Sequence, residues 1–289
     1  ARSSRGDEPI HYPQGRNSMS VPTGSATRIV EEIRIHGIVQ GVGFRPFVFR
    51  LARDQGLDGE VRNEAGMVMI KLAGAIERIE AFVTLIRAAP PPLARIDRIE
   101  RTTLAGGLAR GFSISTSVTG DIVGGEPAIS PDTAVCPECL ADILEPGNRH
   151  FRYPFTNCTN CGPRLSILRA IPYDRHNTSM VDFPMCTDCA REYHDPADRR
   201  FHAQPNACPS CGPRVRLIRP DGSLVSAEST DALADAWALL QRGEILAVKG
   251  LGGYQLACLG TNEAAVARLR RRKRRSDRPF ALMAQDTEV

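Results

Sequence analysis

The chain has 289 residues, 42% of them apolar, which is enough for two or three domains with packed cores. Its formal net charge is +4, but residues 268–278 alone carry about +7 and leave the remainder at about −3. The basic character is therefore local, which argues against a chain-wide interface with nucleic acid. No apolar run is long enough to span a bilayer and no apolar signal core is present, so we expect a soluble, cytoplasmic protein with no membrane partner.

The first part of the chain predicts a leader and a compact domain. Residues 1–26 are rich in Ser, Gly, Pro and Arg without periodicity, which is typical of a disordered leader. Residues 27–118 show the pattern strand, helix, hairpin, helix and further β structure. This β-α-β-β-α-β order predicts a ferredoxin-like α+β domain. A linker rich in Gly and Pro follows over residues 119–131.

A glycine loop joins the first strand of this domain to its first helix. Glycines allow the backbone amides to turn inward, the helix start adds a partial positive charge, and Arg45 supplies a fork suited to phosphate oxygens. The sequence therefore predicts a phosphate-binding loop made by Gln40, Gly41, Val42, Gly43 and Phe44. A structural loop that only turns the chain is the open alternative.

Four Cys-x-x-Cys pairs lie within residues 132–216. In each half, 18 residues separate the two pairs, and the whole unit repeats with a period of 50. Structural zinc prefers four thiolates in a tetrahedron, and one Cys-x-x-Cys turn supplies two of them. We therefore expect two structural Zn²⁺ sites, with the ligands Cys136, Cys139, Cys158, Cys161, Cys186, Cys189, Cys208 and Cys211. Pairing within each copy is the simplest arrangement, but the spacing also allows crossed pairs, and His150, His194 and His202 are near enough in sequence to substitute.

Residues 217–289 predict the beginning of an α/β unit. A helix, a strand over residues 245–249, a glycine-rich turn, a second helix and an Arg-rich run follow one another, and residues 279–283 predict another strand. Cys258 predicts a small buried core residue. Lysines and arginines near glycines favour phosphate groups, so we expect a nucleotide site that involves Lys249, Gly252, Gly253, Lys273 and Arg275.

Two stretches resemble known families. Gly-x-Val-Gln-Gly-Val-x-Phe-Arg at residues 37–45, with Val-x-Asn at residues 61–63, is similar to the acylphosphatase signature. That resemblance implies that Arg45 binds the phosphoryl group and Asn63 orients the attacking water. Lys-Gly-Leu-Gly-Gly-Tyr at residues 249–254, with the basic residues 272–278, resembles the opening of a YrdC-like domain, a family that binds ATP and forms acyl-adenylates.

The order of an acylphosphatase-like domain, a duplicated four-cysteine module and a YrdC-like unit resembles the HypF family, the carbamoyltransferases of [NiFe]-hydrogenase maturation. The resemblance implies that carbamoyl phosphate is hydrolysed, that carbamate and ATP form carbamoyl-adenylate, and that a cysteine of the partner HypE accepts the carbamoyl group for cyanide-ligand synthesis. The YrdC-like unit is truncated and the C-terminal transferase domain is absent, so we do not expect the whole reaction from this chain. A zinc-dependent protein- or nucleic-acid-binding module, with a structural glycine loop, is the alternative.

Overall fold

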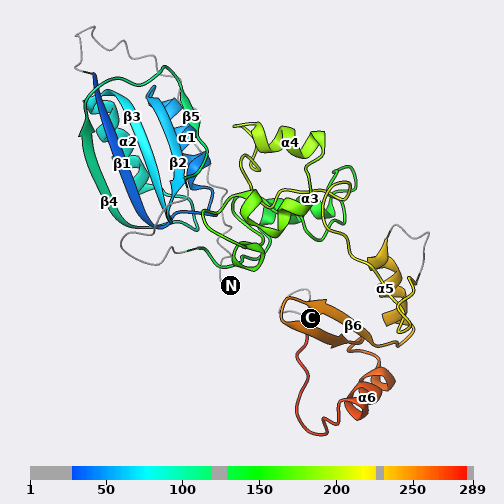
Figure 1. The fold of residues 1–289 in the computed structure, drawn as a ribbon. Helices are drawn as coiled ribbons and strands as arrows, with labels where there is room; N and C mark the ends of the chain where they lie inside the picture. Colours follow the sequence, from blue (N-terminus) through cyan, green and yellow to red (C-terminus); the bar gives the residue numbers. More distant parts are fainter. Residues whose placement is uncertain (1–27, 119–128, 226–230, 285–289) are drawn as a thin grey trace, which may run out of the picture.

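The computed structural model describes residues 28–118, 129–225 and 231–284. The predicted disordered leader lies outside these residues, as does most of the predicted linker. Figure 1 shows three successive parts: a sheet with two helices, a middle part of short helices and long loops, and a last part with two helices and a hairpin. None of the helices in the described ranges is long and apolar enough to cross a membrane.

The first part is a five-stranded sheet with two helices. Its strands follow the order β4-β1-β3-β2-β5, and all neighbours are antiparallel except β2 and β5, which run parallel. This arrangement confirms the predicted ferredoxin-like α+β fold. The elements are β1 (Arg28–Ile38), α1 (Phe44–Asp54), β2 (Asp58–Glu64), β3 (Met67–Ala75), α2 (Ile76–Ala88), β4 (Arg95–Leu104) and β5 (Phe112–Ile114).

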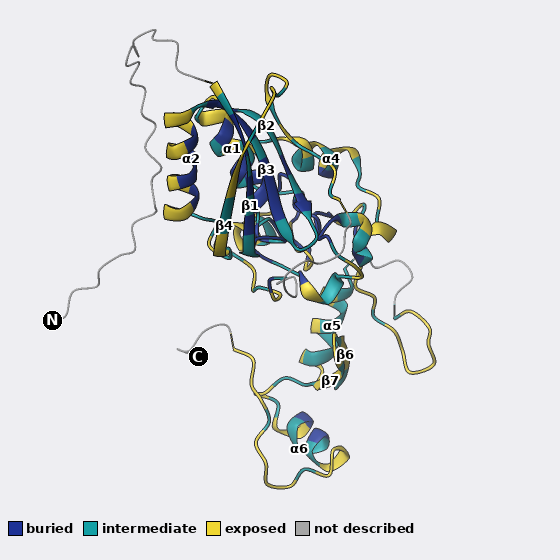
Figure 2. Cartoon of the chain, turned by 60° about the vertical axis from the view of Figure 1, so that its left-hand side comes forward, coloured by how far each residue is buried: buried dark blue, intermediate teal, exposed yellow. Residues whose placement is uncertain are grey.

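The core of this domain lies between one face of the sheet and the two helices. Alternate strand residues point to the same face, so Ile33 and Ile35 of β1 are buried together. The helices contribute residues three or four apart, and Figure 2 shows α2 with its buried side toward the sheet and its exposed side outward. On β2, Asn63 follows the buried Val61 by two residues and therefore faces the same side as the core.

The middle part holds two copies of one small unit. In each copy a helix begins directly after the first cysteine, so the second cysteine of the pair lies in the first helical turn: α3 (Pro137–Leu144) follows Cys136 and α4 (Thr187–His194) follows Cys186. Between the copies the chain forms three short 3-10 helices, η1 (Leu165–Ile167), η2 (Arg175–Asn177) and η3 (Ser179–Asp182). The predicted duplication is therefore present in the fold as well as in the sequence.

The last part comprises α5 (Ala232–Gln241), the hairpin β6 (Leu246–Gly250) and β7 (Gly253–Ala257), and α6 (Glu263–Arg272). Two predictions were wrong here. Residues 279–283 form no strand, because no strand of the described residues pairs with them and an extended segment cannot satisfy its backbone groups alone. Cys258 is only half-buried, and residues close to it in the sequence, such as Tyr254 and Leu256, are exposed rather than packed into a core.

Candidate active site and zinc centres

The glycine loop lies where β1 ends and α1 begins. Gly41 and Gly43 have φ angles of 74° and 73°, in the left-handed region that favours glycine, and this lets the loop turn tightly into the helix. No side chain caps α1, and Pro46 in its first turn has no N–H group. The backbone amides of Phe44 and Arg45 at the helix start therefore offer hydrogen-bond donors to an anion.

Arg45 and Asn63 lie side by side and share one hydrogen-bond acceptor. The carbonyl oxygen of Tyr173 accepts from Arg45 Nη2 at 3.3 Å and from Asn63 Nδ2 at 3.4 Å. Arg45 Nη1 contacts the carboxylate Oδ1 of Asp174 at 2.7 Å and the hydroxyl of Ser117 at 3.3 Å. Both predicted catalytic side chains are buried, with exposed fractions of 8% and 1%. The structure brings the two residues together, and their catalytic roles stay a prediction.

The remaining loop residues have mainly structural side chains. Gln40 Nε2 donates to the carbonyl of Met67 and its Oε1 accepts from the amide of Tyr173, both at 3.0 Å. Val42 and Phe44 are buried in the core of the ferredoxin-like domain. What this loop can offer to a phosphate is therefore its backbone rather than its side chains.

A small cavity lies between the glycine loop and the middle part of the chain. Its volume is about 20 Å³, room for about one water molecule. The loop, Arg45 and Asn63 form one side of the cavity, and Thr159, Arg164, Tyr173 and residues 202–205 form the other. Burial, assisted by the charge of Arg45, lowers the pKa of His202 to about 4. The imidazole is therefore neutral at neutral pH and adds no charge to the site.

Sequence analysis missed this second wall of the site. Tyr173 and Asp174 belong to no motif and are more than 100 residues from Arg45 along the chain. The one sequence feature here is the apolar character of residues 165–184 between the two cysteine units, which indicates packing but names no partner. The wall forms because the fold places the segment between the cysteine units against the glycine loop and Arg45.

Each copy of the middle part brings its four cysteine sulfurs together. In both groups all Sγ atoms lie within 4.8 Å of one another, and the sulfur pairs in closest contact are 3.5 to 3.8 Å apart. A tetrahedron with Zn–S bonds of about 2.3 Å has edges of about 3.8 Å, whereas a disulfide bond is about 2.05 Å long. The donor set and its geometry fit zinc, so the eight predicted cysteines form two structural sites, each closed within one copy.

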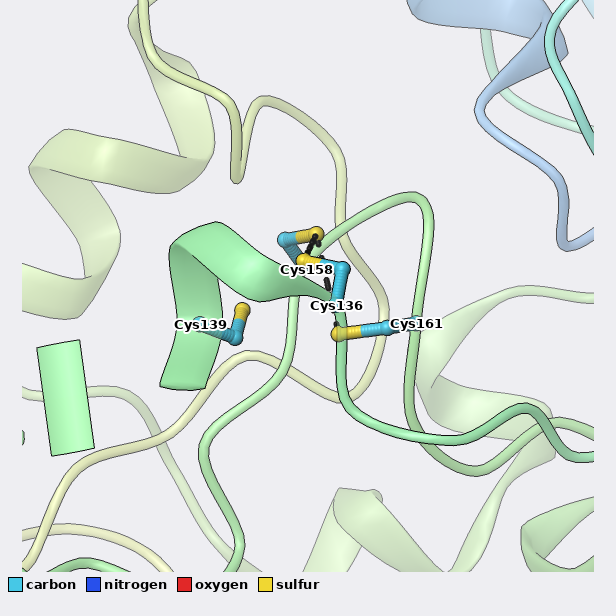
Figure 3. A group of neighbouring side chains, drawn as sticks. All are labelled: Cys136, Cys139, Cys158 and Cys161. Carbon is cyan, nitrogen blue, oxygen red and sulfur yellow. Dashed lines mark hydrogen bonds between the residues drawn. The ribbon is translucent and has the colours of Figure 1, made fainter. Parts of the chain in front are cut away.

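Figure 3 shows the first site, in which Cys136 and Cys139 come from the start of α3 and Cys158 and Cys161 come from the loop that faces it. In neither metal group of the described residues is a histidine among the ligands. His150 is buried beside Asn148, and burial lowers its pKa to about 4. His202 instead packs against the rings of Tyr193 and Phe201.

Each zinc site receives a hydrogen bond from an arginine of the other copy. Arg149 of the first copy donates to the sulfur of Cys189 in the second copy at 3.2 Å and pairs with Glu192. Its counterpart in the second copy, Arg199, donates to the sulfur of Cys139 in the first copy at 2.9 Å and pairs with Asp142. Such N–H···S hydrogen bonds disperse the negative charge of a four-thiolate zinc centre. Each copy therefore completes the surroundings of the other copy's metal.

The residues predicted to bind a nucleotide make local contacts in the structure. Lys249 Nζ donates to the carbonyl of Gly250 at 3.2 Å, and Arg275 Nη2 donates to that of Pro279 at 2.9 Å. Gly252 and Gly253 lie at the turn of the β6–β7 hairpin, and Lys273 is exposed at the end of α6. These contacts do not join the hairpin to the helix end, so the nucleotide site stays a prediction.

Comparisons with known proteins follow the same order as the three parts. The acylphosphatase family model matches residues 31–114, the HypF finger matches residues 135–168 and 185–218, and the Sua5/YciO/YrdC model, described as telomere recombination, matches residues 238–289. An acylphosphatase from Mannheimia succiniciproducens is 41% identical over 73 residues, which cover 25% of this chain and 80% of that protein. The first part is therefore an acylphosphatase domain.

Longer relatives extend across all three parts. The carbamoyltransferase HypF2 of Cupriavidus necator is 54% identical over 252 residues, which cover 87% of this chain and 31% of that protein. The crystal structure of full-length HypF in its phosphate- and nucleotide-bound form is 44% identical with a TM-score of 0.83, over 92% of this chain and 34% of that one. This chain thus spans about a third of the length of the HypF proteins that it matches. With its acylphosphatase domain, two HypF fingers and part of a Sua5/YrdC-type domain, the chain belongs to the HypF family.

Proposed function

We propose that this chain hydrolyses carbamoyl phosphate to carbamate and phosphate, as the first step of a HypF carbamoyltransferase. The observation that carries the proposal is the convergence of Arg45, Asn63 and the amides at the start of α1 on one partly open cavity. Similarity to acylphosphatases and to a phosphate-bound HypF structure supports it.

Arg45 is suited to hold the phosphoryl group. A guanidinium has five N–H donors. Nη1 of Arg45 donates to Ser117 and contacts Asp174, and Nη2 donates to Tyr173. No described residue accepts a hydrogen bond from Nε, so the Nε edge of the guanidinium is the one left for phosphate oxygens. The helix-start amides add further donors toward the same anion. Phosphoryl transfer depends mainly on this kind of charge stabilisation and alignment.

Asn63 is suited to orient the attacking water. Its Nδ2 is fixed by the carbonyl of Tyr173, whereas its Oδ1 is buried and has no hydrogen-bond partner among the described residues. A water that donates a hydrogen bond to Oδ1 would present its lone pair to the phosphorus atom. The P–O bond to the acyl group then breaks, and carbamate and inorganic phosphate leave.

The later steps of the reaction extend this proposal. Carbamate would attack the α-phosphate of ATP near Lys249, Gly252, Gly253, Lys273 and Arg275, giving carbamoyl-adenylate and pyrophosphate. A cysteine thiol of HypE would then accept the carbamoyl group, and AMP would leave. The nucleotide in a related HypF structure and the match to the Sua5/YciO/YrdC family support the ATP step. We place the protein in the cytoplasm, because eight zinc thiolates require a reducing compartment.

Phosphate release from carbamoyl phosphate tests the first step. We expect the purified chain to release phosphate and Arg45→Ala to lower the rate at least about 100-fold, because a donor aimed at developing charge is worth that much. Asn63→Ala should lower it by about the same factor. Arg53→Ala is the matched control, since this exposed arginine lies at the other end of α1. No release by the wild-type chain, with zinc-dependent binding to protein or nucleic acid instead, would favour the binding-module alternative.

A further inference from the structure

Two consecutive residues from the segment between the fingers, Tyr173 and Asp174, cover the hydrolase site. The carbonyl of Tyr173 accepts hydrogen bonds from both Arg45 and Asn63, and its amide donates to Gln40. The carboxylate of Asp174 pairs with Arg45 in a buried setting. Every polar side chain predicted for the hydrolase site therefore contacts this pair of residues.

The finger region holds this pair firmly in place. The hydroxyl of Tyr173 donates to the carbonyl of Pro163 at 3.3 Å, and the next backbone amide, that of Arg175, donates to Gln204 Oε1 at 2.8 Å. Tyr173 is only 2% exposed. A site wall that is fixed by packing and hydrogen bonds on both sides is preorganised for a ligand. Tyr173 and Asp174 therefore form a rigid, preorganised wall of the site.

This wall offers hydrogen-bond acceptors rather than donors. The carbonyl of Tyr173 already accepts from Arg45 and Asn63, so the free acceptor is the carboxylate of Asp174, whose Oδ2 is buried without a partner within the ranges that the structure describes. A buried acceptor without a donor is unfavourable, so such a site favours a ligand that brings N–H or O–H groups. The phosphate of the substrate is not that ligand, because its oxygens are acceptors and its charge is repelled by a carboxylate.

We propose that Asp174, positioned by Tyr173, selects the acyl group of the substrate, and that it favours a carbamoyl group over an acetyl group. The inference rests on the proposed hydrolase function. Repulsion from Asp174, which contacts Nη1 of Arg45, directs the phosphate to the opposite edge with Nε and leaves the acyl group on the Asp174 side. There a carbamoyl NH₂ donates a hydrogen bond to Oδ2 of Asp174, whereas an acetyl methyl group donates none and leaves that buried acceptor unpaired.

The ratio of kcat/KM for carbamoyl phosphate to that for acetyl phosphate, measured on the full chain, tests the inference. We expect the wild-type chain to prefer carbamoyl phosphate and Asp174→Ala to lower the ratio about 10- to 100-fold, the worth of one hydrogen bond to a charged acceptor. Asp174→Asn, which keeps the shape but replaces an acceptor oxygen with a donor, should lower the ratio similarly. The ratio is insensitive to the folded fraction of each preparation, so a variant that folds poorly still gives an answer.

Asp182→Ala is the matched control, because this aspartate lies in the same segment but is exposed and paired with Arg169. It should leave the ratio unchanged. If the ratio of kcat/KM for carbamoyl phosphate to that for acetyl phosphate is unchanged in both Asp174 variants, the inference is overturned. This holds even if kcat/KM changes by the same factor for both substrates. If the wild-type chain hydrolyses neither substrate, the proposed function itself is contradicted. Failure of the inference and failure of the proposed function are therefore distinguishable.

Discussion

Arg164 and Arg214 hold the same position in the two fingers, at the end of the shared sequence Cys-Gly-Pro-Arg. Arg164 is 1% exposed and donates to five carbonyl oxygens, one of which belongs to Gly41 in the glycine loop. Arg214 is exposed. The first finger therefore uses this arginine to dock on the acylphosphatase domain, whereas the second finger leaves it in solvent.

The second finger docks through a different position. Its Phe201 is 4% exposed and lies 5.3 Å from the ring of Phe49 on α1, measured between ring centroids. The counterpart in the first finger, Phe151, is 39% exposed. The two fingers thus keep the same metal ligands but use different positions of the repeat to pack against the acylphosphatase domain. The repeat keeps the metal ligands in both units, whereas the docking positions differ, and residues of the two fingers together form one wall of the candidate site.

Zinc loss should have the largest effect, and it tests whether the fingers are independent. Structural zinc contributes roughly 10 kcal/mol or more to the folding of such units. We expect Cys139→Ser and Cys189→Ser each to remove one of two zinc ions. Because Arg149 and Arg199 reach across to the sulfurs of the opposite site, the remaining ion should be lost at lower chelator concentration than in the wild-type chain. Metal content during a chelator titration measures both effects.

Cys258→Ser is the control for the zinc experiment, since this half-buried thiol lies outside both metal groups. It should keep two zinc ions per chain. If the remaining ion of Cys139→Ser resists chelation as well as in the wild-type chain, the crosswise arginines do not couple the sites, and the fingers are independent units.

Arg164→Ala and Arg214→Ala test the first half of the docking comparison. Removal of Arg164 leaves buried carbonyl oxygens without donors, so we expect a loss of about 3–5 kcal/mol in the free energy of unfolding. The exposed Arg214 should change it by less than about 0.5 kcal/mol. Urea denaturation, with phosphate release as a second measurement, checks the difference. Equal effects of the two substitutions would show that the burial of Arg164 does not stabilise the docked arrangement.

Phe201→Ala and Phe151→Ala test the second half. Truncation of a buried aromatic ring costs about 3 kcal/mol or more, whereas truncation of a partly exposed one costs less. We expect Phe201→Ala to lower the midpoint of thermal unfolding clearly more than Phe151→Ala does. A larger effect of Phe151→Ala would reverse the proposed roles of the two fingers.

The symmetric part of this arrangement could be predicted from the sequence, and the asymmetric part could not. Cysteine spacing specifies the metal ligands because Cys-x-x-Cys turns are local, and the ferredoxin-like domain follows from local periodicity. Arg164 and Arg214 have the same local motif, so no local rule separates the buried residue from the exposed one. Their difference arises from a contact with Gly41, more than 100 residues away.

The same limit applies to the active site. The acylphosphatase resemblance placed Arg45 and Asn63 in one site, and the structure brings them to one acceptor. That acceptor belongs to Tyr173, and neither Tyr173 nor Asp174 has a sequence pattern that links it to phosphate chemistry. Residues that complete a site from a second domain are specified by how the domains dock, which sequence periodicity does not report.

A smaller effect than that of Arg164 or Phe201 is expected from the arginines that each finger donates to the other finger's sulfurs. Arg149 and Arg199 make equivalent contacts to sulfur and to a carboxylate, and both are partly exposed. We expect Arg149→Ala and Arg199→Ala to lower the free energy of unfolding by similar amounts, about 1–2 kcal/mol each, because charge-assisted hydrogen bonds at partly exposed sites contribute that much. The double variant should depart from the simple sum, since Arg200 pairs with both Asp142 and Glu192 and so joins the partners of the two arginines. Unequal single effects in urea denaturation would mean that the asymmetry of docking extends to the metal sites, and the fingers would then differ in their interior as well as on their docking faces.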